Sequence, residues 1–363
     1  MDRPPRMISA DSHVNPPPQM YRERMPRRFG DRAPRVEQRG QQEVLILPDA
    51  EKLPSGLLAA AGQAYEDVEL VMQRFDQGRQ GGFDPHARIK DQDLDGVAAE
   101  VLFGDDGGGA LRSSDLDLRL ALMQAYNDWL ADFCRVYPER LVGIAELPFW
   151  DVDLALREAQ RVRASGLRGV LMPAIPTTHA YNEDWYEPLW DVLEDLEMPV
   201  NMHLAGPPAT RGLHTDSMAW ITTNKLQMCE PITSMITSGA LERHPKLQLV
   251  SVESMVGWMA WLVAHMDSIY EKQRHVLPMP ITEVPSFYFR RQIHATFVED
   301  PLGIRERHTV GIDCPLWSSD YPHSISSFGR SQELIERDFK GVPEAERDQI
   351  ICGNAARLYG LAG

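Results

Sequence analysis

The stretch MISADSHVNPPP (residues 7–18) places an acid and a histidine two positions apart after an apolar start, and then adds three prolines. Alternate side chains of an extended strand share a face, so Asp11 and His13 should point the same way near its carboxyl end. Because proline cannot continue a strand ladder, the strand should end directly after them. The stretch therefore predicts a strand that presents two metal-competent side chains. From this motif alone, a hydrogen-bonded core histidine beside a helix-capping aspartate is the alternative.

Seven further short runs rich in branched apolar residues follow along the chain. They lie at residues 96–103, 141–149, 166–174, 198–206, 247–254, 291–297 and 314–323. Amphipathic segments separate them, such as DLDLRLALMQAYNDWLADFCRVYP (residues 115–138), whose apolar positions recur at helical spacing before a proline. Eight strand–helix repeats in 363 residues predict an α/β fold, a distorted (β/α)8 barrel, in preference to an open doubly wound sheet.

The interval between the first and second runs is far too long for a single crossover. We therefore expect one barrel domain over residues 1–363, in which residues 15–90 form an inserted cap. Within the cap, AAAGQAYEDVELVMQRFDQG (residues 59–78) predicts a helix. Insertions that follow a barrel strand lie over the active-site face, so the cap should shape substrate choice.

Composition limits the class of protein. A formal net charge of −16 disfavours binding to nucleic acid or to an anionic membrane surface. The sequence has neither a signal-like start nor an apolar run long enough to span a bilayer. Its four cysteines are scattered, which suits a reducing compartment. We expect a cytoplasmic protein that acts on a small molecule and forms a homo-oligomer, a dimer.

Three later strands also end in polar side chains. His203 closes the fifth run, Glu253 closes the sixth, and Asp320 closes the eighth with His323 just beyond it. The carboxyl ends of the strands meet at the mouth of a barrel, where active sites lie. Imidazoles and carboxylates together suit zinc, iron or manganese, and a site with open positions can activate water or polarise a substrate oxygen.

These motifs resemble the amidohydrolase-related branch of the metal-dependent hydrolase superfamily, which includes enzymes like aminocarboxymuconate semialdehyde decarboxylase. The matching pieces are SADSHVNPPPQMYRERMPRRFGDRAPRV, FDPHARIKDQDLDGVAAEVLF, LERHPKLQLVSVESMVGWMAWLVAHMD and WSSDYPHSIS. The resemblance covers most of the chain. It implies a distorted barrel in which a divalent transition metal is held by Asp11, His13, His203 and Asp320.

The sequence departs from the branch at three places. Asn15 stands where the branch usually has glutamate before two prolines, and Glu253 stands where many of its decarboxylases have histidine. The run GVLMPA (residues 169–174) has no lysine to carbamylate, so a bridging ligand for two metals is missing. One ion is the default expectation. Glu253, Glu146 and His294 are further candidate ligands if a second ion binds.

Each candidate has a functional and a structural interpretation. We assign catalytic roles to Asp320, Glu253 and His323, with Glu253 also a candidate metal ligand. Glu253 would instead cap the following helix in the structural interpretation. We assign substrate contacts to Asn15 and His294, although His294 could equally be a packed barrel residue.

Three functions remain open from the sequence. The leading hypothesis is a metal-dependent hydrolase in which activated water attacks an amide, ester or thioester, including acyl-CoA thioesters. The second is nonoxidative decarboxylation of an aromatic or unsaturated acid. The third is a noncatalytic barrel that binds a small molecule. Glu253 favours hydrolysis, because a carboxylate at the sixth strand end would repel an anionic substrate.

Overall fold

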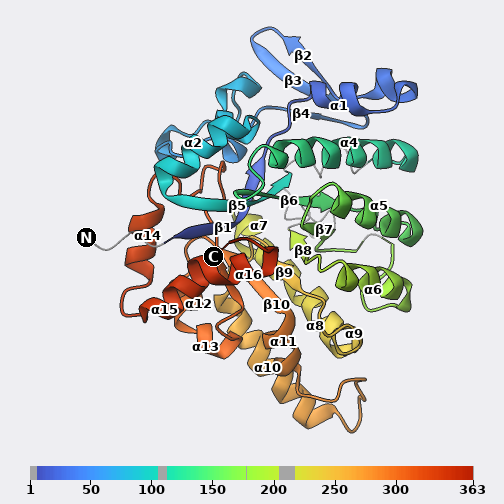
Figure 1. Ribbon diagram of the computed structural model, residues 1–363, viewed down its shortest axis with the longest axis vertical. Helices are drawn as coiled ribbons and strands as arrows, with labels where there is room; N and C mark the ends of the chain where they lie inside the picture. Colours follow the sequence, from blue (N-terminus) through green and yellow to red (C-terminus); the bar gives the residue numbers. More distant parts are fainter. Residues whose placement is uncertain (1–5, 105–112, 177, 204–216, 363) are drawn as a thin grey trace.

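The computed structural model describes residues 6–104, 113–176, 178–203 and 217–362, and its centre is a parallel sheet of eight strands (Figure 1). Neighbouring strands follow the order β1-β5-β6-β7-β8-β9-β10-β11. Their bounds are β1 (Met7–Val14), β5 (Val97–Gly104), β6 (Leu141–Glu146), β7 (Gly169–Pro173), β8 (Val200–His203), β9 (Leu249–Ser251), β10 (Ile293–Phe297) and β11 (Pro315–Trp317).

Backbone hydrogen bonds bring the two ends of this sheet together. The amide of Asp320 donates to the Asp11 carbonyl at 3.0 Å, and the amide of His13 donates to the Tyr321 carbonyl at 2.6 Å. All eight residues of β1 are buried, as expected for a strand covered on both faces. The prediction of a (β/α)8 barrel is confirmed, and all eight predicted strand runs contain an observed strand.

Helices follow the strands and pack outside the sheet, with α4, α5 and α6 side by side in Figure 1. Asp115 and Asp151 cap α4 and α5, since each carboxylate accepts a hydrogen bond from an amide in the first turn. The α-helices are α1 (Gln19–Arg24), α2 (Pro85–Asp95), α4 (Leu116–Arg135), α5 (Val152–Ala164), α6 (Glu187–Asp195), α7 (Ser217–Thr223), α8 (Cys229–Thr237), α9 (Ala240–Arg243), α10 (Gly257–Gln273), α11 (Pro285–Gln292), α12 (Pro301–Arg305), α13 (Arg307–Val310), α14 (Ser331–Asp338), α15 (Glu344–Asp348) and α16 (Asn354–Tyr359). The 3₁₀ helices are η1 (Arg27–Arg32), η2 (Gly56–Leu58), η3 (Tyr65–Asp67), η4 (Phe75–Gln77), η5 (Gln80–Gly82), η6 (Asp184–Tyr186) and η8 (Asn224–Met228), and η9 (Gln349–Gly353) is a π-helix.

The long segment between β1 and β5 carries its own small sheet. Strands β2 (Arg35–Arg39), β3 (Gln42–Leu47) and β4 (Ala50–Lys52) pair antiparallel and lie at the top of Figure 1. A cavity of about 430 Å³ lies between this sheet and the segment after β1, with Val36, Leu45 and Asn15 in its lining. The division into one barrel domain with residues 15–90 as a cap stays a prediction.

The helix predicted for residues 59–78 is wrong. The structure has only the short turns η3 and η4 there, and Gly62 adopts a left-handed backbone with φ of 81°. Leu70 and Val71 are exposed whereas Ala60, Ala61 and Met72 are buried, so the apolar positions do not form one continuous helical face. Without tertiary packing, a short amphipathic pattern gains too little to form a helix.

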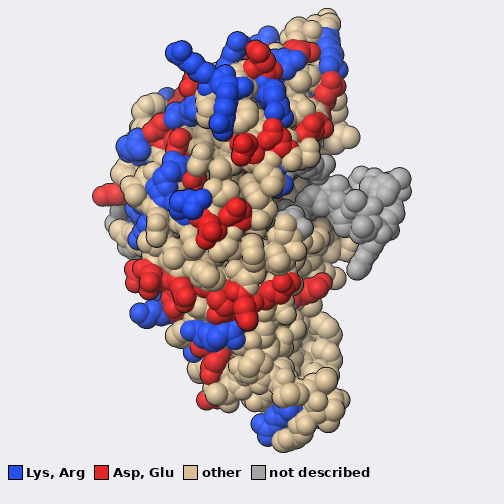
Figure 2. Space-filling model, turned by 90° about the vertical axis from the view of Figure 1, so that its right-hand side faces the viewer, with Lys and Arg blue, Asp and Glu red and all other residues tan. Residues whose placement is uncertain are grey.

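Charged side chains are unevenly distributed on the surface. On the face in Figure 2, basic side chains gather at the upper end, at the height of the cap strands, and acidic side chains form a band lower down. Several cap arginines are exposed and pair with carboxylates, as Arg32 does with Asp115 at 2.7 Å. Among the described helices, none is long and apolar enough to cross a membrane.

Candidate metal centre

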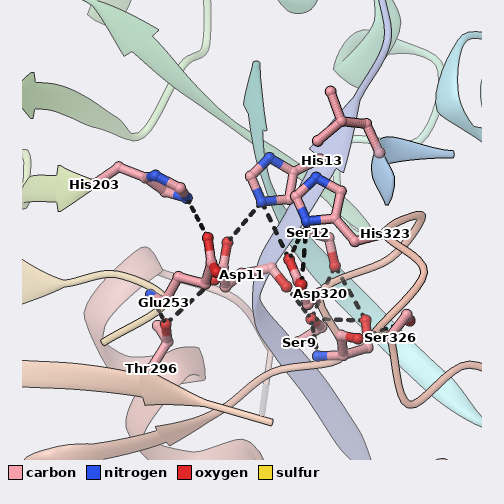
Figure 3. Close-up of polar contacts among 12 residues, drawn as sticks. Ser9, Asp11, Ser12, His13, His203, Glu253, Thr296, Asp320, His323 and Ser326 are labelled. Atoms are coloured by element: carbon pink, nitrogen blue, oxygen red, sulfur yellow. Dashed lines mark hydrogen bonds and ion pairs between the residues drawn. The ribbon is translucent and has the colours of Figure 1, made fainter. Parts of the chain in front are cut away.

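Four predicted ligands converge at the carboxyl ends of three strands (Figure 3). Asp11 and His13 lie near the end of β1, His203 is the last residue of β8, and Asp320 follows β11. The Nε2 atom of His13 lies 3.5 Å from Asp11 Oδ1 and 3.2 Å from Asp320 Oδ1. The His203 ring meets the His13 ring edge-on, with centroids 5.2 Å apart. The period-two alternation of β1 therefore delivers both of its polar side chains to one point.

The donor set fits a divalent transition metal. One ligand atom from each of Asp11, His13 and His203 lies within 4.8 Å of the others, and the same holds for His13, Asp320 and His323. Asp11 is completely buried, yet its Oδ1 accepts no hydrogen bond from the described residues. A buried carboxylate oxygen normally has a partner. Two imidazoles and two carboxylates suit zinc, iron or manganese, so the residues present fit the implied metal.

The charges of the two aspartates depend on this environment. Burial raises the pKa of Asp11 to about 7, an effect that His13 reduces and Asp320 increases. Burial also opposes the charge of Asp320, but His323 and His13 outweigh it and hold the pKa of Asp320 well below its usual range. A bound cation favours the charged form of a carboxyl group, and would therefore favour ionised Asp11.

Asp320 and His323 form a buried pair beside His13. Nδ1 of His323 lies 3.0 Å from Asp320 Oδ1, and its ring stacks on the His13 ring with centroids 4.0 Å apart. Asp320 adopts a left-handed backbone with φ of 55°, and Figure 3 shows its carboxylate turned toward His13. Because the pKa of Asp320 is held low, the His323 imidazole is the member of the pair that can carry a proton, and the ionised Asp320 carboxylate orients it.

Glu253 lies near the cluster but belongs to neither group of converging ligand atoms. Its Oε1 accepts a hydrogen bond from Lys225 Nζ at 2.6 Å, and its Oε2 lies 3.7 Å from His203 Nε2. Its backbone amide donates to Thr296 Oγ1 at 2.7 Å. The Thr296 hydroxyl in turn faces Asp11 Oδ2 at 3.4 Å. Glu253 is thus fixed beside His203, and its roles as catalyst or ligand stay predictions.

A buried ion pair between Arg88 and Glu100 lies against the backbone of β1. The Arg88 side chain, on α2, is fully buried, and its Nη1 donates to the His13 carbonyl at 2.7 Å. Its Nε donates to Glu100, a carboxylate that also accepts from Gln92 at 2.6 Å and from Ser12 at 3.1 Å. The backbone that carries His13 is therefore held by a guanidinium whose charge is compensated.

The structure does not bring His294 to this site. The residue is second in β10, near the amino end of the strand, and its ring nitrogens lie 2.8 Å from the Asp313 carbonyl and 2.9 Å from Gln248 Oε1. Burial lowers the pKa of His294 to about 4. The period-two pattern predicts a strand face but not the depth along the barrel. His294 lies at the amino end of β10, away from the ligand cluster, and a substrate contact by His294 stays a prediction.

Asn15 lies between the metal centre and the cap. Its backbone N–H donates to the Gly82 carbonyl at 2.7 Å, and its side-chain Nδ2 donates to the Leu58 carbonyl at 3.2 Å. A substrate contact by Asn15 stays a prediction.

Sequence reasoning missed Lys225, Thr296 as a partner of Asp11, and Phe103. The centroid of the Phe103 ring, near the end of β5, lies 6.3 Å from that of the His13 ring and 5.6 Å from that of the His203 ring. Phe103 therefore lies beside both imidazoles. Phe103 and Thr296 stand at strand ends, a signal that could have found them. Lys225 has no such signal, because only the folded chain brings η8 to Glu253.

Known proteins similar to this chain have the same fold and related sequences. The amidohydrolase family model matches residues 10–361. A gamma-resorcylate decarboxylase from Rhizobium sp. (strain MTP-10005) is 26% identical over 256 residues, which cover 65% of this chain and 75% of that protein. A 2-amino-3-carboxymuconate-6-semialdehyde decarboxylase from Dictyostelium discoideum is 22% identical, with 77% of each chain covered.

Solved structures agree with this fold. A crystal structure of an amidohydrolase from Mycobacterium avium subsp. paratuberculosis K-10 has a TM-score of 0.79 at 21% identity. The match covers 99% of this chain and 100% of the amidohydrolase chain. A dihydroxybenzoic acid decarboxylase from Polaromonas sp. JS666, solved with manganese and the inhibitor 2-nitroresorcinol, has a TM-score of 0.69 at 18% identity, with 98% and 97% covered.

The decarboxylases among these relatives contradict the prediction of a hydrolase that acts on an amide, ester or thioester. They favour the alternative, nonoxidative decarboxylation. Our preference for hydrolysis rested on repulsion between Glu253 and an anionic substrate. Lys225 removes the basis for that argument, because its ammonium lies 2.6 Å from Glu253 and offsets the charge.

Proposed function

We propose that this chain, which belongs to the amidohydrolase family, is a metal-dependent nonoxidative decarboxylase of a small aromatic carboxylic acid. The named activities of its relatives support the reaction class. The structural observation that carries the proposal is the His323 imidazole, which can hold one proton against the buried Asp320 carboxylate at 3.0 Å. Decarboxylation needs such a proton, because the ring carbon that loses CO2 must gain one.

Asp11, His13, His203 and Asp320 would hold one divalent transition metal. Such an ion would supply Lewis acidity that attracts the substrate carboxylate and an adjacent oxygen. The chain's own residues then orient the substrate. The Phe103 ring and the stacked His13 and His323 rings border the mouth, and a flat aromatic substrate suits such walls.

The reaction balances with one proton. The bond between the ring carbon and the carboxylate breaks, its electron pair stays on the ring carbon, and CO2 leaves. The ring carbon takes a proton from the His323 imidazole and forms a C–H bond. Water then returns a proton to the imidazole. His323 is exposed enough for this exchange, since 10% of its side chain reaches solvent while Asp320 is completely buried.

A deuterium experiment tests this role. Manganese-loaded protein is incubated in D2O with 2,6-dihydroxybenzoate, which is γ-resorcylate, and with related ortho-hydroxybenzoates. We expect CO2 release and one deuterium on the carbon that carried the carboxylate. His323→Phe should lower turnover by about 10²-fold or more with the metal retained, the effect of removing a positioned proton carrier. No CO2 from any of these acids, with the metal site loaded, would overturn the proposal.

The identity of the ion and the expected dimer are tested by separate measurements. The manganese in the Polaromonas decarboxylase favours manganese as the first ion to test. Reconstitution of the chelator-treated protein with each ion, followed by CO2 measurement, ranks the three. Light scattering of the full chain tests the dimer.

A further inference from the structure

Lys225 is a cation at the barrel mouth that the proposed reaction does not yet use. It lies on η8, and its Nζ is 2.6 Å from Oε1 of Glu253, the residue that follows β9 by two positions. Each of the two side chains is only 18% exposed. Solvent and salt screen a shielded pair less than a surface pair, so the charges of Lys225 and Glu253 act strongly on their surroundings.

Glu253 is held in place from several sides. It adopts a left-handed backbone with φ of 53°, which is unfavourable for a residue other than glycine. Its amide donates to Thr296 Oγ1 at 2.7 Å, and its Oε2 lies 3.7 Å from His203 Nε2. Figure 3 shows the carboxylate turned toward the His203 ring. This conformation indicates that the direction of the Glu253 carboxylate matters at the site.

The charges at the mouth show why a cation is needed there. Asp11, Asp320 and Glu253 bring three carboxylates to the same region. A divalent ion would offset the ligand carboxylates of Asp11 and Asp320, whereas Glu253 lies outside the ligand groups and is offset by Lys225 at 2.6 Å. Without Lys225, a substrate carboxylate would meet an uncompensated like charge beside His203. Like charges brought together in a binding site strongly oppose association.

We propose that Lys225 is a specificity-determining residue, which lets the site accept the carboxylate form of its substrate by offsetting Glu253 beside His203. The inference rests on the proposed function, because it takes the substrate to be an aromatic acid. Lys225 stays paired with Glu253 and acts through its charge. The pair thus occupies the sixth strand end without repelling the anion that the reaction consumes.

A purely structural role makes a different prediction. If Lys225 only fastens η8 to the segment after β9, its loss would disturb charged and neutral ligands alike. If its charge matters, loss of Lys225 would weaken binding of an acid and spare an uncharged ligand of the same shape. The two roles therefore separate in a comparison of 2,6-dihydroxybenzoate with 2,6-dihydroxybenzamide.

The experiment measures binding of both compounds by calorimetry to the metal-loaded full chain, with His323→Phe present in every variant so that the acid is bound and not turned over, and metal content is determined for each variant. Lys225→Met should weaken binding of the acid by about 10–100-fold, while the amide changes by less than about threefold. Lys225→Arg keeps the charge and should bind the acid nearly as the parent does. Glu253→Gln removes a negative charge and should tighten acid binding. The double variant Lys225→Met with Glu253→Gln should return to within about threefold of the parent.

Three results would overturn the inference. They are equal losses for acid and amide in Lys225→Met, an unchanged affinity for the acid in that variant, and a double variant that binds the acid as weakly as Lys225→Met alone. The double variant and Lys225→Arg decide the matter if Lys225→Met does not fold. Because binding is measured without turnover, a parent protein that binds the acid charge-selectively but releases no CO2 would overturn the proposed function and leave this inference standing.

Discussion

Loss of the buried Arg88 side chain should destabilise the barrel far more than loss of a surface arginine. In Arg88→Leu, Glu100 keeps its neutral donors Gln92 and Ser12 but loses its only described cationic partner, and its side chain is 3% exposed. Removing one partner of a buried ion pair costs about 3–5 kcal/mol. With 363 residues, an unfolding entropy of about 2.1 cal/mol/K per residue converts this loss to a Tm decrease of about 4–7 °C.

Calorimetric and urea unfolding of Arg88→Leu measure the loss directly. Arg32→Leu is the matched control, because Arg32 pairs with Asp115 at 2.7 Å but both side chains are exposed, 49% and 36%. That exposed pair should contribute no more than about 1 kcal/mol. The double variant Arg88→Leu with Glu100→Gln removes the stranded charge and should recover part of the stability. An Arg88→Leu protein within about 1 kcal/mol of the parent would refute the reasoning that a compensated guanidinium holds the backbone of His13.

Three further predictions concern other residues. Thr296→Val removes the hydroxyl that faces Asp11 and should lower metal affinity about 10–100-fold in a competition titration. Thr296→Ser keeps the hydroxyl and should keep the metal affinity. Equal affinities in the two variants would contradict a role of the Thr296 hydroxyl in orienting Asp11. His294 has a pKa of about 4 in the folded chain against 6.5 ordinarily, so its stabilising effect is fully present above pH 6.5 and is lost as the pH falls toward 4. Urea unfolding should show the parent losing about 3 kcal/mol more than His294→Gln between pH 7.5 and pH 4, and parallel pH profiles would count against this. Leu58→Trp, which fills part of the cap cavity, should change KM and leave metal content unchanged, and a metal-poor variant would show that the cap supports the metal centre.

The residues of the barrel mouth were predictable where the signal is local. Asp11 and His13 share a strand face and precede three prolines, and His203 and Asp320 also follow apolar strand runs. Parallel strands of a barrel end at one mouth, so the sequence predicts their convergence once the strands are identified. The distances of 3.2 and 3.5 Å around His13 Nε2 agree with that expectation.

Other features depend on tertiary structure that local patterns do not contain. The strand pattern around His294 predicts which face of β10 it lies on but not how far along the strand the metal centre lies. Thr296, two residues nearer the carboxyl end of β10, is the residue that contacts Asp11. Lys225 meets Glu253 across 28 residues of sequence. The positive charge of Lys225 offsets the negative charge of Glu253. Glu253 considered alone suggested repulsion of an anionic substrate and so led to the incorrect expectation of hydrolysis. The cap segment near Gly62 has a helical apolar pattern, but Gly62 is left-handed and only part of the pattern, including Ala60 and Ala61, is buried.

The central claim is that one metal held by the strand-end cluster enables decarboxylation. It is tested most directly by titrating chelator-treated protein with Mn²⁺ and recording ¹³CO2 released from carboxyl-labelled 2,6-dihydroxybenzoate. Release should be absent without metal, rise in proportion to added Mn²⁺, and stop rising at about one ion per chain, since one set of two imidazoles and two carboxylates supplies the ligands. Equal release from metal-free protein, or no release at any amount of Mn²⁺, zinc or iron, would contradict the claim.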